Sequence, residues 1–130
     1  MSHTDFVRDF LKAIGRDQVV GDKDHWYFPD AVQVEFPNKL LPKGATRNLA
    51  DLKAAGERGR AIVERQTYEV VSTIESGDAV AVEAIFRATF KVDMLGLPKG
   101  QTMTARFAMF FTMQDGRISR HHTYDCFEPW

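Results

Sequence analysis

Residues 79–90 read AVAVEAIFRATF and residues 104–113 read TARFAMFFTM, and these two stretches decide the fold class. In both, alternate residues are apolar, which is typical of a β-strand with one buried face. The buried sets are Val80, Val82, Ala84, Phe86, Ala88 and Phe90, and then Ala105, Phe107, Met109, Phe111 and Met113. The pair Asp115-Gly116 predicts a type I′ hairpin leading into a strand over 117–127, because both turn positions need positive φ. A weaker alternation over 66–75, followed by Ser76-Gly77-Asp78, adds a preceding strand. The second half of the chain is therefore predicted to be an antiparallel meander.

The first half of the chain carries helix signals instead. Ser2 and Asp5 have capping-box spacing, and the apolar residues behind them repeat at helical intervals as far as Ile14, so a helix should end between Gly15 and Gly21. Asn48, with Asp51 in the first turn, predicts the start of a second long helix. Its small and apolar face should pack on the sheet, and two glycines there would let another backbone approach. That face consists of Leu49, Leu52, Gly56, Gly59 and Val63.

The segment between these helices is less regular. Residues 22–30 are strongly aromatic and fit either a short helix or an irregular connection. Val32, Val34 and Phe36 alternate with polar residues and predict a short strand that Pro37 ends. Residues 38–47 contain Pro42 and Gly44 without periodicity and predict a loop. Helices first and strands later predict one α+β domain over residues 1–130, with helices on one face of a curved sheet.

Composition narrows the partners. The 17 basic residues balance the 18 acidic ones, so neither nucleic acid nor a membrane surface is an expected partner. Cys126 is the single cysteine, which excludes an intrachain disulfide and a cysteine-based zinc site. We expect neither a metal nor an organic cofactor. The first residues lack the basic and apolar runs of a signal peptide, so a cytoplasmic location is expected.

Several phrases together resemble a known family along nearly the whole chain. They are FPDAV at 28–32, VEFP at 34–37, SGDAVAVE at 76–83, DGRI at 115–118 and YDCF at 124–127. In this order they resemble SnoaL-like, ketosteroid-isomerase-like proteins of the nuclear transport factor 2 superfamily. The resemblance implies a cone-shaped (cystatin-like) fold with N-terminal helices packed on a strongly curved, mainly antiparallel sheet. Because this superfamily includes isomerases, cyclases, dehydratases and noncatalytic modules, the fold does not select a reaction.

Only some of the catalytic residues of these enzymes have a counterpart in this sequence. The position of the ketosteroid isomerase base is occupied by Phe36, and residues 105–110 carry no carboxylate, so steroid isomerisation by that mechanism is disfavoured. The aspartate that SnoaL-type cyclases use on the last strand matches Asp125, although their helper histidine is absent. A dehydratase-like pairing of Asp22 or Asp24 with a histidine of the last strand is a loose match.

The last strand holds the candidate catalytic residues His121, His122, Tyr124 and Asp125, which offer a base, an acid and a phenol in a small volume. Strand alternation forbids all four from facing inward. If Ile118 points to the core, His122 and Tyr124 follow it, unless a bulge shifts the phase. The family resemblance favours Asp125 inward. In the structural alternative, the histidines form cross-strand hydrogen bonds and Asp125 caps a turn.

A hydrophobic pocket is predicted from the number of aromatic residues. The ligand-binding candidates are Trp26, Phe28, Phe36, Tyr68, Phe86, Phe107, Met109 and Phe111, although the same list also describes an ordinary core. The leading hypothesis is binding of a small hydrophobic, ring-containing molecule, with cofactor-independent isomerisation, cyclisation or dehydration as candidate reactions. The alternative is a noncatalytic ligand-binding or dimerisation module.

The outward face of residues 79–90 suggests self-association. Glu83 and Arg87 are predicted to form an ion pair on this face, and Ile85 makes it too apolar for an ordinary solvent surface. We therefore expect a homodimer, the arrangement that the family resemblance also implies.

Overall fold

The computed structural model describes residues 2–16 and 23–130. Along the chain the elements are α1 (His3–Arg16), α2 (Lys23–Trp26), β1 (Tyr27–Glu35), β2 (Ala45–Arg47), α3 (Leu49–Ile62), β3 (Val63–Ser76), β4 (Ala79–Phe90), β5 (Thr102–Gln114) and β6 (Arg117–Phe127). The six strands form one sheet in the order β2-β1-β6-β5-β4-β3. The β1–β6 pair is parallel and every other neighbouring pair is antiparallel.

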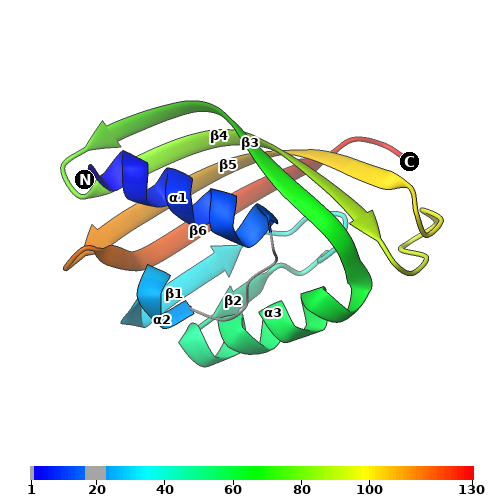
Figure 1. Ribbon diagram of the computed structural model, residues 1–130, viewed down its shortest axis with the longest axis horizontal. Coiled ribbons are helices and arrows are strands. Elements are labelled where there is room, and N and C mark those ends of the chain that lie inside the picture. Colours follow the sequence, from blue (N-terminus) through cyan, green and yellow to red (C-terminus); the bar gives the residue numbers. More distant parts are fainter. Residues whose placement is uncertain (1, 17–22) are drawn as a thin grey trace.

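The helices cover one side of this curved sheet. Figure 1 shows α1 lying across the strands, while α3 lies along the side where β1 and β2 are found. Helix α1 buries Val7, Phe10 and Leu11 against the sheet. The α+β class and the mainly antiparallel, strongly curved sheet are therefore confirmed. No helix in the described ranges is both long enough and apolar enough to cross a membrane.

The meander matches its sequence pattern closely. The alternating apolar residues of β4 and β5 are buried without exception. Asp115 has φ 49° and Gly116 has φ 77°, as a type I′ turn requires. The local caps are also formed. The Asn48 side chain accepts a hydrogen bond from the Asp51 N–H at 2.9 Å, and the Asp51 carboxylate accepts one from the Asn48 N–H at 3.0 Å.

The irregular segment contains more strand than its pattern predicts. Residues 23–26 form a short helix, and β1 starts immediately after it at Tyr27. Within the predicted loop, β2 pairs with residues 33–35 of β1. A strand of three residues has too few side chains to show periodicity, so only pairing with its neighbour reveals it. The first helix is described as far as Arg16, and residues 17–22 lie outside the described part of the chain.

Two packing predictions need correction. A Cβ placed on Gly59 would meet no atom within 4 Å, so this glycine of α3 faces open space and not an approaching backbone. On the outer face, Arg87 pairs with Glu69 at 2.9 Å, whereas Glu83 accepts a hydrogen bond from Ser72. The predicted Glu83–Arg87 ion pair is therefore wrong, because the partner on β3 is closer in the antiparallel register.

Candidate functional site

A β-bulge in β6 decides which of the candidate catalytic residues face inward. Thr112 of β5 pairs with Arg120, but Met113 pairs with Ile118, which leaves Ser119 as an extra residue. Ile118, His121 and Thr123 are all buried, so the alternation changes phase at Ser119. The inward set is consequently the one that includes His121 and Asp125.

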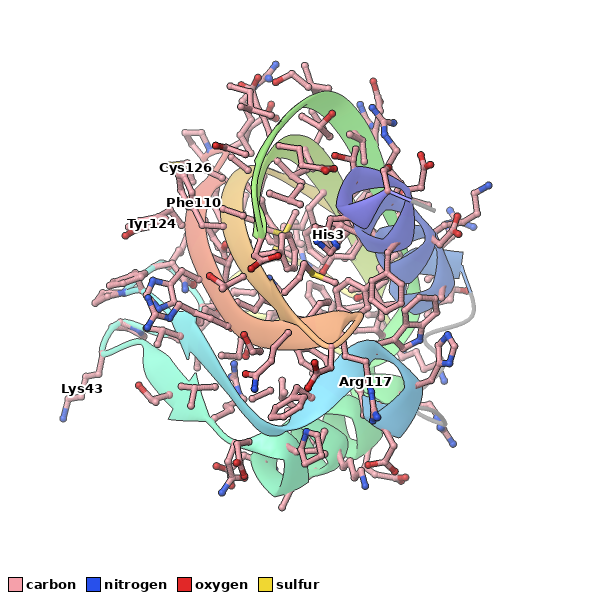
Figure 2. All side chains as sticks on the ribbon, turned by 90° about the vertical axis from the view of Figure 1, so that its left-hand side faces the viewer. His3, Lys43, Phe110, Arg117, Tyr124 and Cys126 are labelled. Carbon is pink, nitrogen blue, oxygen red and sulfur yellow. The ribbon has the colours of Figure 1, made fainter. Side chains whose placement is uncertain are left out.

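The two other candidates lie on the opposite face, which corrects the assignment based on Ile118 alone. Tyr124 is 43% exposed and stacks on Phe36, with 4.4 Å between ring centroids. His122 packs against the same Phe36 ring at 5.6 Å. Figure 2 shows Tyr124, Phe110 and Cys126 projecting together from the outside of β5 and β6. Neither His122 nor Tyr124 can reach a ligand held inside the cone.

A cavity of about 290 Å³ lies between the helices and the concave face of the sheet. Its apolar and small residues are Phe10, Ile14, Tyr27, Leu52, Ala55, Gly56, Gly59 and Tyr68. Its polar residues are Lys23, Gln33, Glu35, Arg47, Arg60, Gln66 and His121. Ala55, Gly56 and Gly59 of α3 line the cavity with a methyl group or no side chain, which leaves this volume empty of side-chain atoms. About half of the lining residues are polar, so the wall differs from the aromatic pocket that the sequence predicts.

Strand β1 turns its polar residues toward this cavity. Gln33 and Glu35 line it, while Val32 on the other face is 42% exposed. The parallel register places Gln33 beside His121 and Glu35 beside Thr123. Arg47 of β2 donates hydrogen bonds to Gln33 at 2.8 Å and to Glu35 at 3.0 Å. Strands β1, β2 and β6 thereby build a connected polar wall.

Asp125 stands at the edge of this wall as a second carboxyl group beside Glu35. The pKa of Asp125 is raised to about 6, chiefly by burial and also by the charge of the Glu35 carboxylate and a hydrogen bond with it. A hydrogen bond from the Thr123 hydroxyl and the charge of Arg47 act in the opposite direction. Asp125 is not part of a turn cap. Its environment instead resembles that of a group suited to proton transfer near neutral pH.

His121 is a neutral histidine built into the core side of the cavity. Burial lowers its pKa to about 3, with further contributions from His122 and Lys23. Its Nδ1 lies 3.1 Å from the Tyr27 hydroxyl, a cross-strand hydrogen bond of the kind that the structural alternative predicts. The ring stacks on Phe111 with 4.3 Å between centroids. Within the described residues, Nε2 has no hydrogen-bond partner.

Tyr68 supplies a phenol to the same cavity. Burial raises its pKa, and the nearby Asp125, Tyr27 and Glu35 raise it further. The phenol therefore stays protonated at neutral pH and can donate a hydrogen bond. Among the eight predicted ligand-binding residues, Tyr68 is the one that lines this cavity.

The other seven predicted ligand-binding residues lie elsewhere. Phe86 and Phe107 stack on each other at 4.8 Å, and Met109 and Phe111 are buried in the core. Trp26 packs edge-on against Phe6 and Phe10, Phe28 is partly buried outside the cavity lining, and Phe36 lies on the outer face. The buried members, Phe86, Phe107, Met109 and Phe111, belong to the hydrophobic core, because close packing of apolar area stabilises the fold.

The remaining candidate groups are the aspartates before α2 and at its start, and clusters of metal-binding side chains. Asp24 is exposed and pairs with Lys53 at 3.0 Å, so the dehydratase-like match through Asp24 is wrong; Asp22 lies outside the described residues. The described residues contain no group of three histidine, cysteine or carboxylate side chains arranged for a metal ion.

Sequence reasoning missed Gln33, Glu35 and Arg47. The first two alternate with Val32 and Val34, so the period of β1 is visible in the sequence, but the period does not show which set faces inward. The signal that could have found them is the acidic residue next to Phe36, the position at which the family resemblance places a base.

The chain matches a known protein family over most of its length. A family model described as a SnoaL-like domain matches residues 7–121. The fold is similar to that of IdmH, a candidate polyketide cyclase from Streptomyces antibioticus, with 21% identity, a TM-score of 0.76 and coverage of 94% of this chain and 90% of that one. It is also similar to a SnoaL-like polyketide cyclase from Agrobacterium tumefaciens, with 13% identity, a TM-score of 0.73 and coverage of 96% and 91%.

A third similar structure is a protein with a ketosteroid isomerase-like fold from Catenulispora acidiphila, solved with trimethylamine. It shares 15% identity, with a TM-score of 0.75 and coverage of 95% of this chain and 86% of that one. Comparison with curated proteins gives no match. At these identities the solved structures establish the fold alone.

Proposed function

This chain belongs to the SnoaL-like domain family, and we propose that it binds a small ring-containing molecule in the cone cavity and catalyses a cofactor-independent acid–base reaction on it. The observation that carries this proposal is the bulge at Ser119, which turns His121 and Asp125 toward the wall that holds Glu35. The reaction class is proton abstraction next to a carbonyl group, the step shared by isomerisation, cyclisation and dehydration.

Asp125 is the general base in this proposal. Its pKa of about 6 leaves it ionised at pH 7 and more basic than an ordinary aspartate. The Glu35 carboxylate next to it favours uptake of the proton, because protonation of either group relieves their repulsion. The proton taken from carbon can then be returned to another atom of the same ligand, as an isomerisation requires.

His121 and Tyr68 are the hydrogen-bond donors in this proposal. Because the pKa of His121 is lowered, the imidazole stays neutral and donates from Nε2 when Tyr27 donates to Nδ1. A neutral donor inside a buried site stabilises negative charge that develops on a carbonyl oxygen. Tyr68 can provide a second hydrogen bond from the same wall.

The experiment that tests this proposal measures hydrogen–deuterium exchange of 2-tetralone in D₂O by NMR. The wild-type protein should accelerate loss of the α-protons, and Asp125→Asn should lower this rate by about 10²–10⁴-fold. Tyr124→Phe is the matched control. Tyr124 is the residue before Asp125 and its side chain faces outward, so this substitution should leave the exchange rate unchanged. Binding of 2-tetralone without accelerated exchange would support the noncatalytic ligand-binding alternative.

We also propose that the outer face of the sheet forms a homodimer. Val32, Phe110 and Tyr124 are 42%, 51% and 43% exposed on neighbouring strands β1, β5 and β6, and the Phe36 ring packs against Tyr124 and His122. Phe36, Phe110 and Tyr124 form an aromatic cluster on this face. Exposed apolar side chains that lie together are more typical of a protein interface than of a solvent-facing sheet. The cluster lies away from Glu83 and Arg87, whose hydrogen bonds to β3 make that part of the face polar.

A further inference from the structure

We infer that the cavity is built for a ring-containing anion whose charged oxygen, a carboxylate or an acidic hydroxyl, lies between the Lys23 ammonium and His121 Nε2. This inference rests on the proposed binding function of the same cavity. It names the chemical class of the ligand, which the proton-transfer proposal leaves open.

The charge of the cavity wall is the first observation. Lys23, Arg47 and Arg60 line the cavity, whereas Glu35 is the single carboxylate among the described residues of its lining. Glu35 is already paired with Arg47 at 3.0 Å. No carboxylate of the described residues forms a salt bridge with Lys23 or Arg60. With respect to residues 2–16 and 23–130, these two cations of the lining are therefore available to an anion.

The unpartnered imidazole nitrogen is the second, independent observation. His121 is 4% exposed, lines the cavity and has no partner for Nε2 among the described residues. Its Nδ1 is the recorded partner of the buried Tyr27 hydroxyl, at 3.1 Å. If Tyr27 donates this bond, its proton is satisfied and Nε2 carries the imidazole hydrogen. Because buried N–H groups are normally hydrogen-bonded, a ligand oxygen is a suitable acceptor for this N–H.

Lys23 and His121 act on the same region of the cavity. The positive charge of Lys23 disfavours protonation of the His121 ring and so helps to lower the pKa of His121. Lys23 is itself partly buried, so its ammonium has lost part of its hydration. A ligand oxygen carrying negative charge would restore solvation to the ammonium and accept the hydrogen bond of Nε2.

The apolar residues of the lining accommodate the ring of the ligand. Leu52 and Ala55 of α3 and Phe10 of α1 line the cavity, and Gly59 leaves open space where a side chain would stand. A volume of about 290 Å³ accommodates one or two fused rings. The ligand class is thus a compact ring acid, oriented with its charge toward Lys23 and its ring toward α3.

Two isosteric probes, 2-naphthoate and 2-naphthamide, test this inference by isothermal titration calorimetry at pH 7.5. They share one shape and differ in charge, so the wild-type protein should bind the naphthoate at least about tenfold more tightly. Lys23→Met should remove this preference while leaving naphthamide binding unchanged. Lys43→Met, which removes the same charge from an exposed loop position, should change neither affinity.

Gly59→Leu locates the binding site. A Cβ at this position meets no atom within 4 Å, and Gly59 lines the cavity, so the leucine should abolish naphthoate binding by filling the cavity. Retained binding in Gly59→Leu would mean that the anion binds elsewhere, and the inference would be overturned. Equal affinities for the two probes, an unaltered preference in Lys23→Met, or no binding of either probe would overturn it as well.

The two proposals fail independently. Asp125→Asn should bind 2-naphthoate at least as tightly as the wild type, because it removes a negative charge near the cavity. If deuterium exchange of the neutral 2-tetralone is absent but naphthoate binding depends on Lys23, the acid–base proposal fails and the anion site stands. If deuterium exchange depends on Asp125 but 2-naphthoate and 2-naphthamide bind equally well, the anion site fails and the acid–base proposal stands.

Discussion

Asp125→Asn should make the folded protein more stable at neutral pH even though it removes the proposed catalytic group. The pKa of Asp125 is raised from 3.8 to about 6, chiefly by burial. Between these values the folded state keeps a proton that the unfolded chain has released. The free energy of unfolding therefore falls as pH rises from about 4 to about 6, and above pH 6 the folded state carries the full cost of an ionised Asp125.

The size of this cost follows from the distance between the two pKa values. They lie about two pH units apart, which corresponds to at most about 3 kcal/mol. Because Asp125 keeps partial contact with solvent, screening reduces the expected gain in Asp125→Asn to about 1–2 kcal/mol. The asparagine keeps the shape of the side chain and can still accept the hydrogen bond from Thr123.

Urea unfolding curves of the wild type and Asp125→Asn at pH 4, 5, 6, 7 and 8 measure this difference. The gain should be largest at pH 7–8 and should vanish toward pH 4. Asp115→Asn, an exposed residue of the β5–β6 turn, is the matched control and should show no pH-dependent gain. A less stable Asp125→Asn at pH 7.5, or a gain of the same size at pH 4, would refute the assignment of Asp125 as a destabilised carboxyl group.

Three further predictions follow from the packing and electrostatics. Phe107→Ala should lower the free energy of unfolding by about 3–5 kcal/mol in urea melts, because the ring is 8% exposed and stacked on Phe86; a loss below about 1 kcal/mol would show that it borders open space. His121, whose pKa is lowered to about 3, contributes stability that is present above pH 6.5 and is lost as pH falls toward 3. Its ¹H–¹⁵N spectrum should show one neutral tautomer protonated at Nε2 from pH 8 to pH 5, and a titration near pH 6.5 would contradict its burial. Phe110→Asp should convert the proposed dimer to a monomer in light scattering, whereas a wild-type protein that is monomeric at high micromolar concentration would exclude the dimer.

Much of the fold was determined by sequence alone, because the responsible interactions are local. The Asn48–Asp51 capping box joins residues three apart, and the Asp115-Gly116 turn depends on two adjacent φ angles. The alternation in β4 and β5 predicted their buried faces correctly, because a long strand with one wholly apolar side can face the core in only one phase. Asp125, in contrast, was a candidate through the family resemblance, and its catalytic role stays a prediction.

The candidate site, in contrast, was decided by the tertiary structure. The period of a strand can be read from its residues. Which residues of β6 face inward depends on a bulge at Ser119, and no residue pattern in the sequence predicts that bulge. Strand β1 turns Gln33 and Glu35 inward, against its apolar pattern, because that part of the cone encloses a cavity and its outer face carries the apolar surface. Arg47 reaches Glu35 through a strand of three residues that only pairing with β1 defines. Polar groups far apart in the chain were thus brought together by strand order and register, which are long-range properties that local sequence patterns do not contain.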